Sequence, residues 1–347
     1  MRMKKIFTLM LALTATITMM AQMHGAMTFV GKSTFYVTNP MSGTQMGNTD
    51  NPADTLVYSG ADFTLPSLTY GDMVIPSFTI KDTQYSGGYA GVTWDDQTFS
   101  ATVTDASGEE KAITGTSLTG SFTHGNGIYK VLLTVTFKYG SMPMPITYTI
   151  ESYYVKAYQA PITVTVGGTF GPYTTSEDAT YNVRTYIEDD VTKIDVAMPT
   201  YNLAGTVMGD LTVGGYKVCG LTYDEAKGGY YRDYSADGLS AHFTAVSGGV
   251  ATMDADYTLG VNKSTGTPSS LLVKIDNGNL SATNNFALGN MPFDCVSTFD
   301  TTTSDIKAVS NNDATVNDDK CYNLAGQRVS TAAKGIVIRN GRKFINK

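Results

Sequence analysis

Histidine is scarce in this chain, and its three imidazoles lie in unrelated sequence contexts. His24 lies close to the N-terminus, His124 in a predicted turn, and His242 on the polar side of a predicted strand. Catalytic triads and most zinc centres need imidazoles that meet other ligands or nucleophiles in space. The sequence therefore predicts no catalytic site, no metal site and no cofactor. A pocket placing His124 or His242 within hydrogen-bonding distance of two carboxylates or a cysteine would contradict this prediction.

Two groups of acidic residues, Glu109-Glu110 and Glu188-Asp189-Asp190, fall in predicted turns. Glycosidases need two carboxylates about 5 to 9.5 Å apart on rigid elements, so these groups are interpreted as solvated turns. Gly31-Lys32-Ser33-Thr34 resembles the end of a phosphate-binding loop, but Ala26 stands where the first glycine is required. A non-enzymatic protein is therefore predicted, with a carbohydrate-active hydrolase as the third hypothesis.

Cysteine is equally sparse, with Cys219, Cys295 and Cys321 as the only thiols. Their spacing does not match a zinc site. Cys219 and Cys295 fall in one predicted domain and can form a disulfide if their Cα atoms lie within about 7 Å. Two buried, unbridged thiols are the alternative.

Two tyrosine clusters are the candidate binding residues: Tyr153-Tyr154 with Tyr158 nearby, and Tyr230-Tyr231 with Tyr234 nearby. A tyrosine combines an apolar body with a polar tip, which suits glycan or protein partners. Because adjacent residues of a strand point to opposite faces, half of each cluster is expected in the core.

Alternating apolar and polar residues run through the chain and predict antiparallel strands. Ile162–Val166 alternates at every position, and Leu133, Val135 and Phe137 alternate with threonine and lysine. Glycine- and asparagine-rich turns separate these runs. An internal repeat relates Pro66 to Pro199, Phe99–Thr104 to Leu239–Thr244, and Leu132–Val135 to Leu271–Lys274.

The fold class expected from this repeat is all-β: two tandem antiparallel barrels of about eight strands each, over residues 23–158 and 159–300, followed by a short C-terminal hairpin. Two-sheet sandwiches are the competing architecture. A small apolar ligand inside a barrel is the second functional hypothesis, although eight strands enclose a space that side chains alone can fill.

The Gly168-Thr169-Phe170 opening, the Leu/Met-Pro strand and the following Gly-x-Met/Val-x-hydrophobic strand resemble the calycin-like β-barrel domain of secreted Gram-negative proteins. The resemblance covers residues 28–157 and 162–299. It implies a lipocalin-like barrel and no established biochemical activity.

Both ends of the chain differ from its middle. Residues 1–22 combine Arg2, Lys4 and Lys5 with an apolar stretch that ends at Ala21, as in a cleaved export signal. No later apolar run is long enough to span a membrane. Residues 301–320 are rich in Thr, Ser, Asn and Asp and predict a flexible linker.

Residues 321–347 carry six Lys or Arg and no acid. Two apolar runs flank Asn340-Gly341 there, a pair that favours a type I′ hairpin turn. This segment resembles the C-terminal sorting segment of type IX secretion cargo, which implies secretion and sorting machinery as a partner and an extracellular or outer-membrane surface location. If the signal does not work, the protein is expected in the periplasm. The residues that carry the resemblance are Tyr322, Gly326, Gly335, Asn340, Gly341 and Lys347.

The formal net charge of −7 makes nucleic acid an unlikely partner, because an acidic surface repels phosphates. The sequence as a whole therefore predicts a secreted or surface-displayed β-barrel protein with a binding role. Its ligand is a glycan, a protein or an apolar small molecule.

Overall fold

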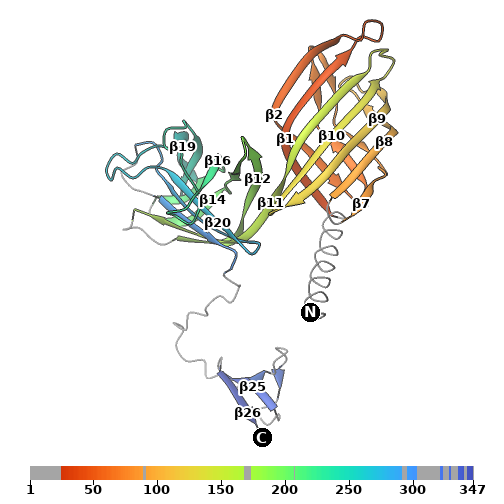
Figure 1. Cartoon of the computed structure of the whole chain (residues 1–347). Coiled ribbons are helices and arrows are strands. Elements are labelled where there is room, and N and C mark those ends of the chain that lie inside the picture. The colour runs from red at the N-terminus through yellow and green to blue at the C-terminus, as the bar shows by residue number, and fades with distance from the viewer. Residues whose placement is uncertain are drawn as a thin grey trace. The chain divides into compact units, whose positions relative to one another are not determined.

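The computed structural model describes residues 25–88, 91–167, 173–206, 208–290 and 295–302, with four short stretches of the C-terminal segment, 321–322, 328–329, 335–339 and 342–346. The elements within this part of the chain are all β-strands, which confirms the all-β part of the predicted fold class (Figure 1). None of the described residues belongs to a helix that could cross a membrane. The predicted export signal and residues 303–320 of the predicted linker lie outside the described residues.

The first large sheet, called the N-terminal sheet, has the strand order β6-β3-β2-β1-β11-β10-β9-β8. Its strands form where the sequence alternates, and the inward residues Leu133, Val135 and Phe137 are fully buried. A small hairpin, β4–β5, lies between β3 and β6 in the chain, and β7 pairs with β8. The bounds are β1 (Ala26–Thr38), β2 (Gln45–Ser59), β3 (Asp62–Leu65), β4 (Leu68–Tyr70), β5 (Met73–Ile75), β6 (Phe78–Ile80), β7 (Ser86–Gly88), β8 (Gly91–Thr104), β9 (Glu110–Gly125), β10 (Ile128–Tyr139) and β11 (Ile146–Val166).

A side chain of β8 contacts Gln84 in the segment that joins β6 to β7. The Gln97 amide on β8 accepts a hydrogen bond from the Gln84 backbone N–H at 2.8 Å and donates one to the Gln84 carbonyl at 2.8 Å. The Trp94 indole N–H donates to the Thr83 hydroxyl beside them at 3.2 Å. Gln97 thus makes the pair of hydrogen bonds that a neighbouring strand would otherwise make.

The second half forms a ring of eight strands, called the C-terminal barrel, in the order β11-β12-β13-β16-β17-β20-β21-β22. The ring is closed, because β11 pairs with β22 on one side and β12 on the other. A separate four-stranded sheet has the order β14-β15-β18-β19. The bounds are β12 (Tyr173–Glu188), β13 (Val191–Ala197), β14 (Tyr201–Thr206), β15 (Gly209–Val213), β16 (Lys217–Asp224), β17 (Gly229–Asp233), β18 (Ser240–Ser247), β19 (Val250–Thr258), β20 (Ser270–Asp276), β21 (Asn279–Phe286) and β22 (Cys295–Asp300).

One closed eight-stranded antiparallel barrel is therefore present where two were predicted. In the N-terminal sheet the backbone ladders of the described residues end at β6 on one side and at the short strand β7, which pairs with β8, on the other. The predicted boundary at residues 158 and 159 also falls inside β11, a single strand that continues from the N-terminal sheet into the barrel.

The repeat read from the sequence is matched in part. The Pro66 and Pro199 segments each precede a hairpin, β4–β5 and β14–β15. However, Phe99–Thr104 lies in β8 of the large sheet, whereas Ser240–Thr244 of the matched segment lies in β18 of the four-stranded sheet. An extra hairpin, β18–β19, displaces the later part of the match, so these two segments do not occupy equivalent places.

Each half has its own buried core. Trp94, Tyr148 and Phe137 fill the N-terminal one. In the other, Tyr201, Tyr216 and Asn284 are buried and joined by hydrogen bonds from the Asn284 amide to both hydroxyls, at 3.2 and 2.7 Å. Side chains thus occupy the middle of both halves.

The predicted bridge between Cys219 and Cys295 is not formed. Cys219 has a free thiol that is exposed on β16, whereas Cys295 is buried on β22. One side chain points out of the barrel and the other into it, so the geometry of a disulfide is not available.

The C-terminal segment belongs to a second compact unit, Thr303–Lys347. Its described strands are β23 (Cys321–Tyr322), β24 (Arg328–Val329), β25 (Gly335–Arg339) and β26 (Arg342–Asn346). The predicted hairpin is confirmed, because β25 and β26 pair from Gly335 opposite Asn346 to Arg339 opposite Arg342. Gly326, Asn340, Gly341 and Lys347 lie outside the described residues, whereas Tyr322 and Gly335 lie on strands.

Candidate functional site

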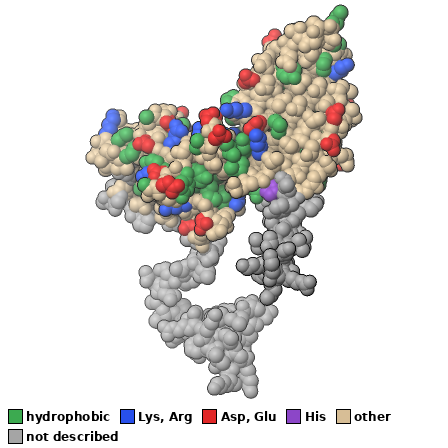
Figure 2. All heavy atoms as spheres, viewed as in Figure 1, with side chains coloured by type: hydrophobic (Ala, Val, Ile, Leu, Met, Phe, Trp, Pro, Cys, Tyr) green, Lys and Arg blue, Asp and Glu red, His purple; other side chains and the backbone are tan. Residues whose placement is uncertain are grey.

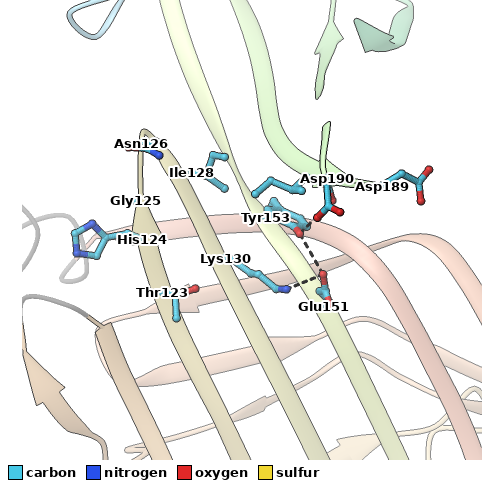
Figure 3. Close-up of a pocket in the computed structure, with 11 residues that line it drawn as sticks. Thr123, His124, Gly125, Asn126, Ile128, Lys130, Glu151, Tyr153, Asp189 and Asp190 are labelled. Atoms are coloured by element: carbon cyan, nitrogen blue, oxygen red, sulfur yellow. Dashed lines mark hydrogen bonds and ion pairs between the residues drawn. The ribbon is translucent and has the colours of Figure 1, made fainter. Parts of the chain in front are cut away.

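Two adjoining hollows lie where β11 passes from the N-terminal sheet to the C-terminal barrel, with cavity volumes of about 520 and 510 Å³. They share Glu151, Tyr153, Ile187 and Asp189 as walls, and together they are called the junction groove. Figure 3 shows the residues that line the larger hollow. The larger hollow is also lined by Thr123, His124, Gly125, Asn126, Ile128, Lys130 and Asp190, and the smaller one by Gly31, Lys32, Pro52, Arg184, Tyr186 and Glu188.

The centre of the groove is a charged contact between neighbouring strands. The Lys130 ammonium lies 2.8 Å from Glu151 Oε1, and the Tyr153 hydroxyl donates to the same oxygen at 3.1 Å (Figure 3). The hydrogen bond from Lys130 holds the pKa of Glu151 below its usual value. Glu151 is therefore ionised at neutral pH.

The opposite wall is the turn between β12 and β13. Asp189 and Asp190 have φ angles of +52° and +60°, the left-handed values that a type I′ turn requires. Both side chains are exposed, and within the described part of the chain neither forms an ion pair. Glu188 beside them is held by Lys193 at 3.0 Å and Lys32 at 3.1 Å, and these contacts lower its pKa. The turn thus presents two carboxylates to the groove.

An arginine fixes the position of this wall. Arg184 pairs with the buried Asp195 at 2.5 Å, and its other terminal nitrogen donates to the Val30 carbonyl of β1 at 3.1 Å. The guanidinium lies 4.5 Å from the ring centre of Tyr186. Contacts of one residue with both halves of the chain hold the groove in shape.

A glycine lets β1 approach β11 at the groove. A Cβ atom at Gly31 would overlap the carbonyl oxygen of Glu151. β1 pairs with β11 on one side and with β2 on the other, and its middle contains the sequence Gly31-Lys32-Ser33-Thr34. This sequence is therefore not a phosphate-binding loop, which lies between a strand and a helix.

The predicted tyrosines have different environments. Only Tyr153 lines the junction groove, and it is 8% exposed. Tyr154 is half-buried and packs against the N-terminal core. Tyr230 packs against the barrel core, and the Tyr231 ring lies under the Lys227 ammonium at 4.3 Å.

Sequence reasoning missed Lys130, Glu151 and Arg184, which have no motif and lie on three different strands. The pairing register of β10 with β11 brings Lys130 close to Glu151, because Lys130 stands opposite Tyr153 and Leu132 opposite Glu151. Apart from the tyrosine pair, the sequence signal for this groove was the acidic run at 188–190, which was interpreted as a solvated turn.

His24 lies outside the described residues, and the two described histidines lie in separate places. His124 lines the larger hollow, and its ring stacks with Phe122 and Tyr129 at centroid distances of 6.3 and 6.1 Å. His242 lies between two carboxylates of β19, 2.8 Å from Asp256 and 3.1 Å from Asp254, and its pKa is raised mainly by the hydrogen bond with Asp256. All three side chains are more than half exposed, so they form a surface cluster and not a pocket.

The described residues contain no group of three or more His, Cys, Asp or Glu side chains that could hold a metal ion. The chemistry available at the junction groove is hydrogen bonding and charge. Carboxylates, an ammonium, an asparagine amide and a tyrosine hydroxyl surround a space open to polar ligands.

No family model and no curated protein matches the chain. It is similar to a solved structure from Bacteroides fragilis NCTC 9343 described as a "putative outer membrane protein", with 15% identity, coverage of 81% of this chain and 97% of that chain, and a TM-score of 0.25.

Proposed function

We propose that this chain is an exported, non-enzymatic binding protein that holds an oligosaccharide in the junction groove. The observation that carries the proposal is the groove itself, whose two hollows of about 520 and 510 Å³ have the size of ligand sites. Carboxylates such as Asp189 and Asp190 accept hydrogen bonds from sugar hydroxyls, and Lys130 and Asn126 donate them.

The apolar-carrier hypothesis has less support. A carrier needs an empty apolar interior, whereas Trp94, Tyr148 and Phe137 fill one half and a tyrosine and asparagine network crosses the other. A hydrolase is also disfavoured, because Glu151 is engaged with Lys130 and its lowered pKa makes it a poor general acid.

The test is binding of the mature chain to an oligosaccharide array, followed by calorimetry with the best ligand. In the double variant D189N/D190N we expect affinity to fall by about 10-fold or more, because a hydrogen bond to a charged group contributes about 1.5–3 kcal/mol. Asparagine tolerates positive φ, so the turn is kept. The control is E225Q, which changes an exposed acid in the β16–β17 turn. The proposal would be wrong if the unchanged chain bound no oligosaccharide on the array. It would also be wrong if D189N/D190N bound the ligand with unchanged affinity.

We also propose that the two halves are related copies of one calycin-like domain. The strand order supports this proposal, because the two halves can be matched position by position. The N-terminal sheet has the order β6-β3-β2-β1-β11-β10-β9-β8, and the barrel has the order β16-β13-β12-β11-β22-β21-β20-β17. On this proposal the contact between Gln97 and Gln84 is the place where the first copy closes with side chains.

Export is proposed from the two ends of the chain, with the C-terminal hairpin as an address for a type IX secretion system. We expect a chain ending at Lys320 to stay in the periplasm while the full chain reaches the surface or the medium, as measured by cell fractionation and immunoblotting. The hairpin belongs to a separate compact unit, so its removal should leave the thermal unfolding of residues 25–302 nearly unchanged. Equal distribution of the two chains would leave the hairpin without an address function.

A further inference from the structure

Methionines gather at one end of the N-terminal sheet. At this end β1 turns into β2 and β10 into β11 (Figure 1). Met142 and Met144 lie in the loop between β10 and β11. This loop is fixed beside the end of β1, because the Thr38 backbone N–H donates to the Pro145 carbonyl at 2.9 Å. Met46, near the start of β2, stands opposite Val37 of β1.

A fourth methionine reaches the same end on the β4–β5 hairpin. Met73 stands opposite Tyr70 in that hairpin. The ring of Tyr70 packs on Phe35 of β1 at 6.3 Å, and a Cβ at Gly47 of β2 would overlap it. Met46, Met73, Met142 and Met144 together are called the methionine cluster.

The cluster lines the edge of the core and not the open surface. All four side chains are half-buried, and Met73, Met142 and Met144 pack against the same N-terminal core. Val37 is buried and stands opposite both Met46 and Ile146, and Met144 precedes Ile146 by two residues. Met46 and Met144 thus lie on either side of the end of β1, where the Thr38 backbone N–H donates to Pro145 and the Asn39 backbone N–H to Thr44, both at 2.9 Å.

We propose that the methionine cluster binds one soft monovalent cation, Cu(I) or its analogue Ag(I). Thioether sulfur is a soft ligand that selects Cu(I) over harder cations. Pro143 and Pro145 restrict the backbone of the methionine before each of them, so Met142 and Met144 are held with few conformations. The site is separate from the junction groove and does not depend on the function proposed for it.

Methionine also fills irregular gaps in apolar cores, and leucine does the same without a sulfur. A change from methionine to leucine keeps the volume and the apolar surface and usually costs less than about 1.5 kcal/mol. Leucine variants therefore separate ligation from packing.

The experiment is an anaerobic competition of the mature full-length chain with the chromophoric Cu(I) chelator bathocuproine disulfonate. One Cu(I) per chain is expected, with sulfur ligands in X-ray absorption and equal affinity at pH 5 and pH 8, because thioethers do not titrate. Loss of one outer-shell partner already costs a metal site about 10–100-fold, so M142L/M144L should lose more than about 100-fold in affinity.

The matched control is M253L, a half-buried methionine that packs against the barrel core. It should bind Cu(I) as the unchanged chain does. Absence of Cu(I) binding, unchanged affinity in a folded M142L/M144L variant, or nitrogen and oxygen ligands in the absorption spectrum would each overturn the proposal. If that variant fails to fold, the ligand set of the unchanged chain decides.

Discussion

At the scale of single residues, the ion pairs of the groove differ in how far their side chains are buried. A buried pair fixes the shape of the groove, whereas an exposed pair contributes little to it. Asp195 is 2% exposed and is held by Arg184 at 2.5 Å and by the Gly220 backbone N–H at 2.9 Å. Lys32 is 75% exposed in its pair with Glu188. A buried pair that loses one partner leaves an uncompensated charge, whereas an exposed pair is screened by water.

We therefore expect the variant D195N to be destabilised by about 3 kcal/mol, because the Arg184 guanidinium would remain largely buried without its counter-charge. The control is K32Q, which removes an exposed cation from the same region and should cost less than about 1 kcal/mol. Urea unfolding followed by circular dichroism measures both. Similar midpoints for the two variants would show that Asp195 does not support the groove.

The composition of the groove was only partly predictable from the sequence. Tyr153 was identified because it is adjacent to Tyr154 in the sequence. Lys130 and Glu151 are distant in the sequence and meet only through the pairing of β10 with β11. A one-residue change of register turns every side chain of a strand to the other face. Without the register, isolated charges cannot be assigned to a common site.

At the scale of elements, the predictions succeed where local pattern decides the structure. Alternation located β10 and the second half of β11, and the hairpin signal in the C-terminal segment located β25 and β26. They fail where closure depends on contacts distant in sequence. The bridge from Gln97 to Gln84 replaces a backbone ladder, and no periodic pattern announces a side chain in that role.

The repeat shows the same limit. Pro66 and Pro199 each precede a two-stranded hairpin, but the later matched segments lie on strands with different neighbours, β8 of the large sheet and β18 of the four-stranded sheet. Apolar alternation is alike in every half-buried strand, so short matches between strands do not identify equivalent positions. The proposed correspondence of the two halves therefore rests on strand order and not on these short matches.

At the scale of the whole molecule, β11 joins two cores that are otherwise separate. Its residues up to Tyr154 pair with β1, and residues from Val155 onward pair with β12. The junction groove exists because one strand serves both halves, with the wall from β12 held against β1 by Arg184. Division of the chain at residue 158 would therefore damage the barrel and not simply separate two domains.

This gives a prediction about where the barrel begins. A chain of residues 153–302 keeps the pairing of Val155–Tyr158 with Tyr181–Arg184, whereas a chain of 159–302 loses it together with the buried Tyr158 ring. Burial of one large apolar side chain contributes about 1.5–3 kcal/mol, and each backbone hydrogen bond about 1 kcal/mol. The shorter chain should therefore be less stable by roughly 3 kcal/mol or more in urea unfolding followed by far-ultraviolet circular dichroism. As a control, chains 23–154 and 23–158 should have nearly the same stability, because the N-terminal sheet does not pair with Val155–Tyr158. Equal midpoints for 153–302 and 159–302 would show that the barrel closes without its share of β11.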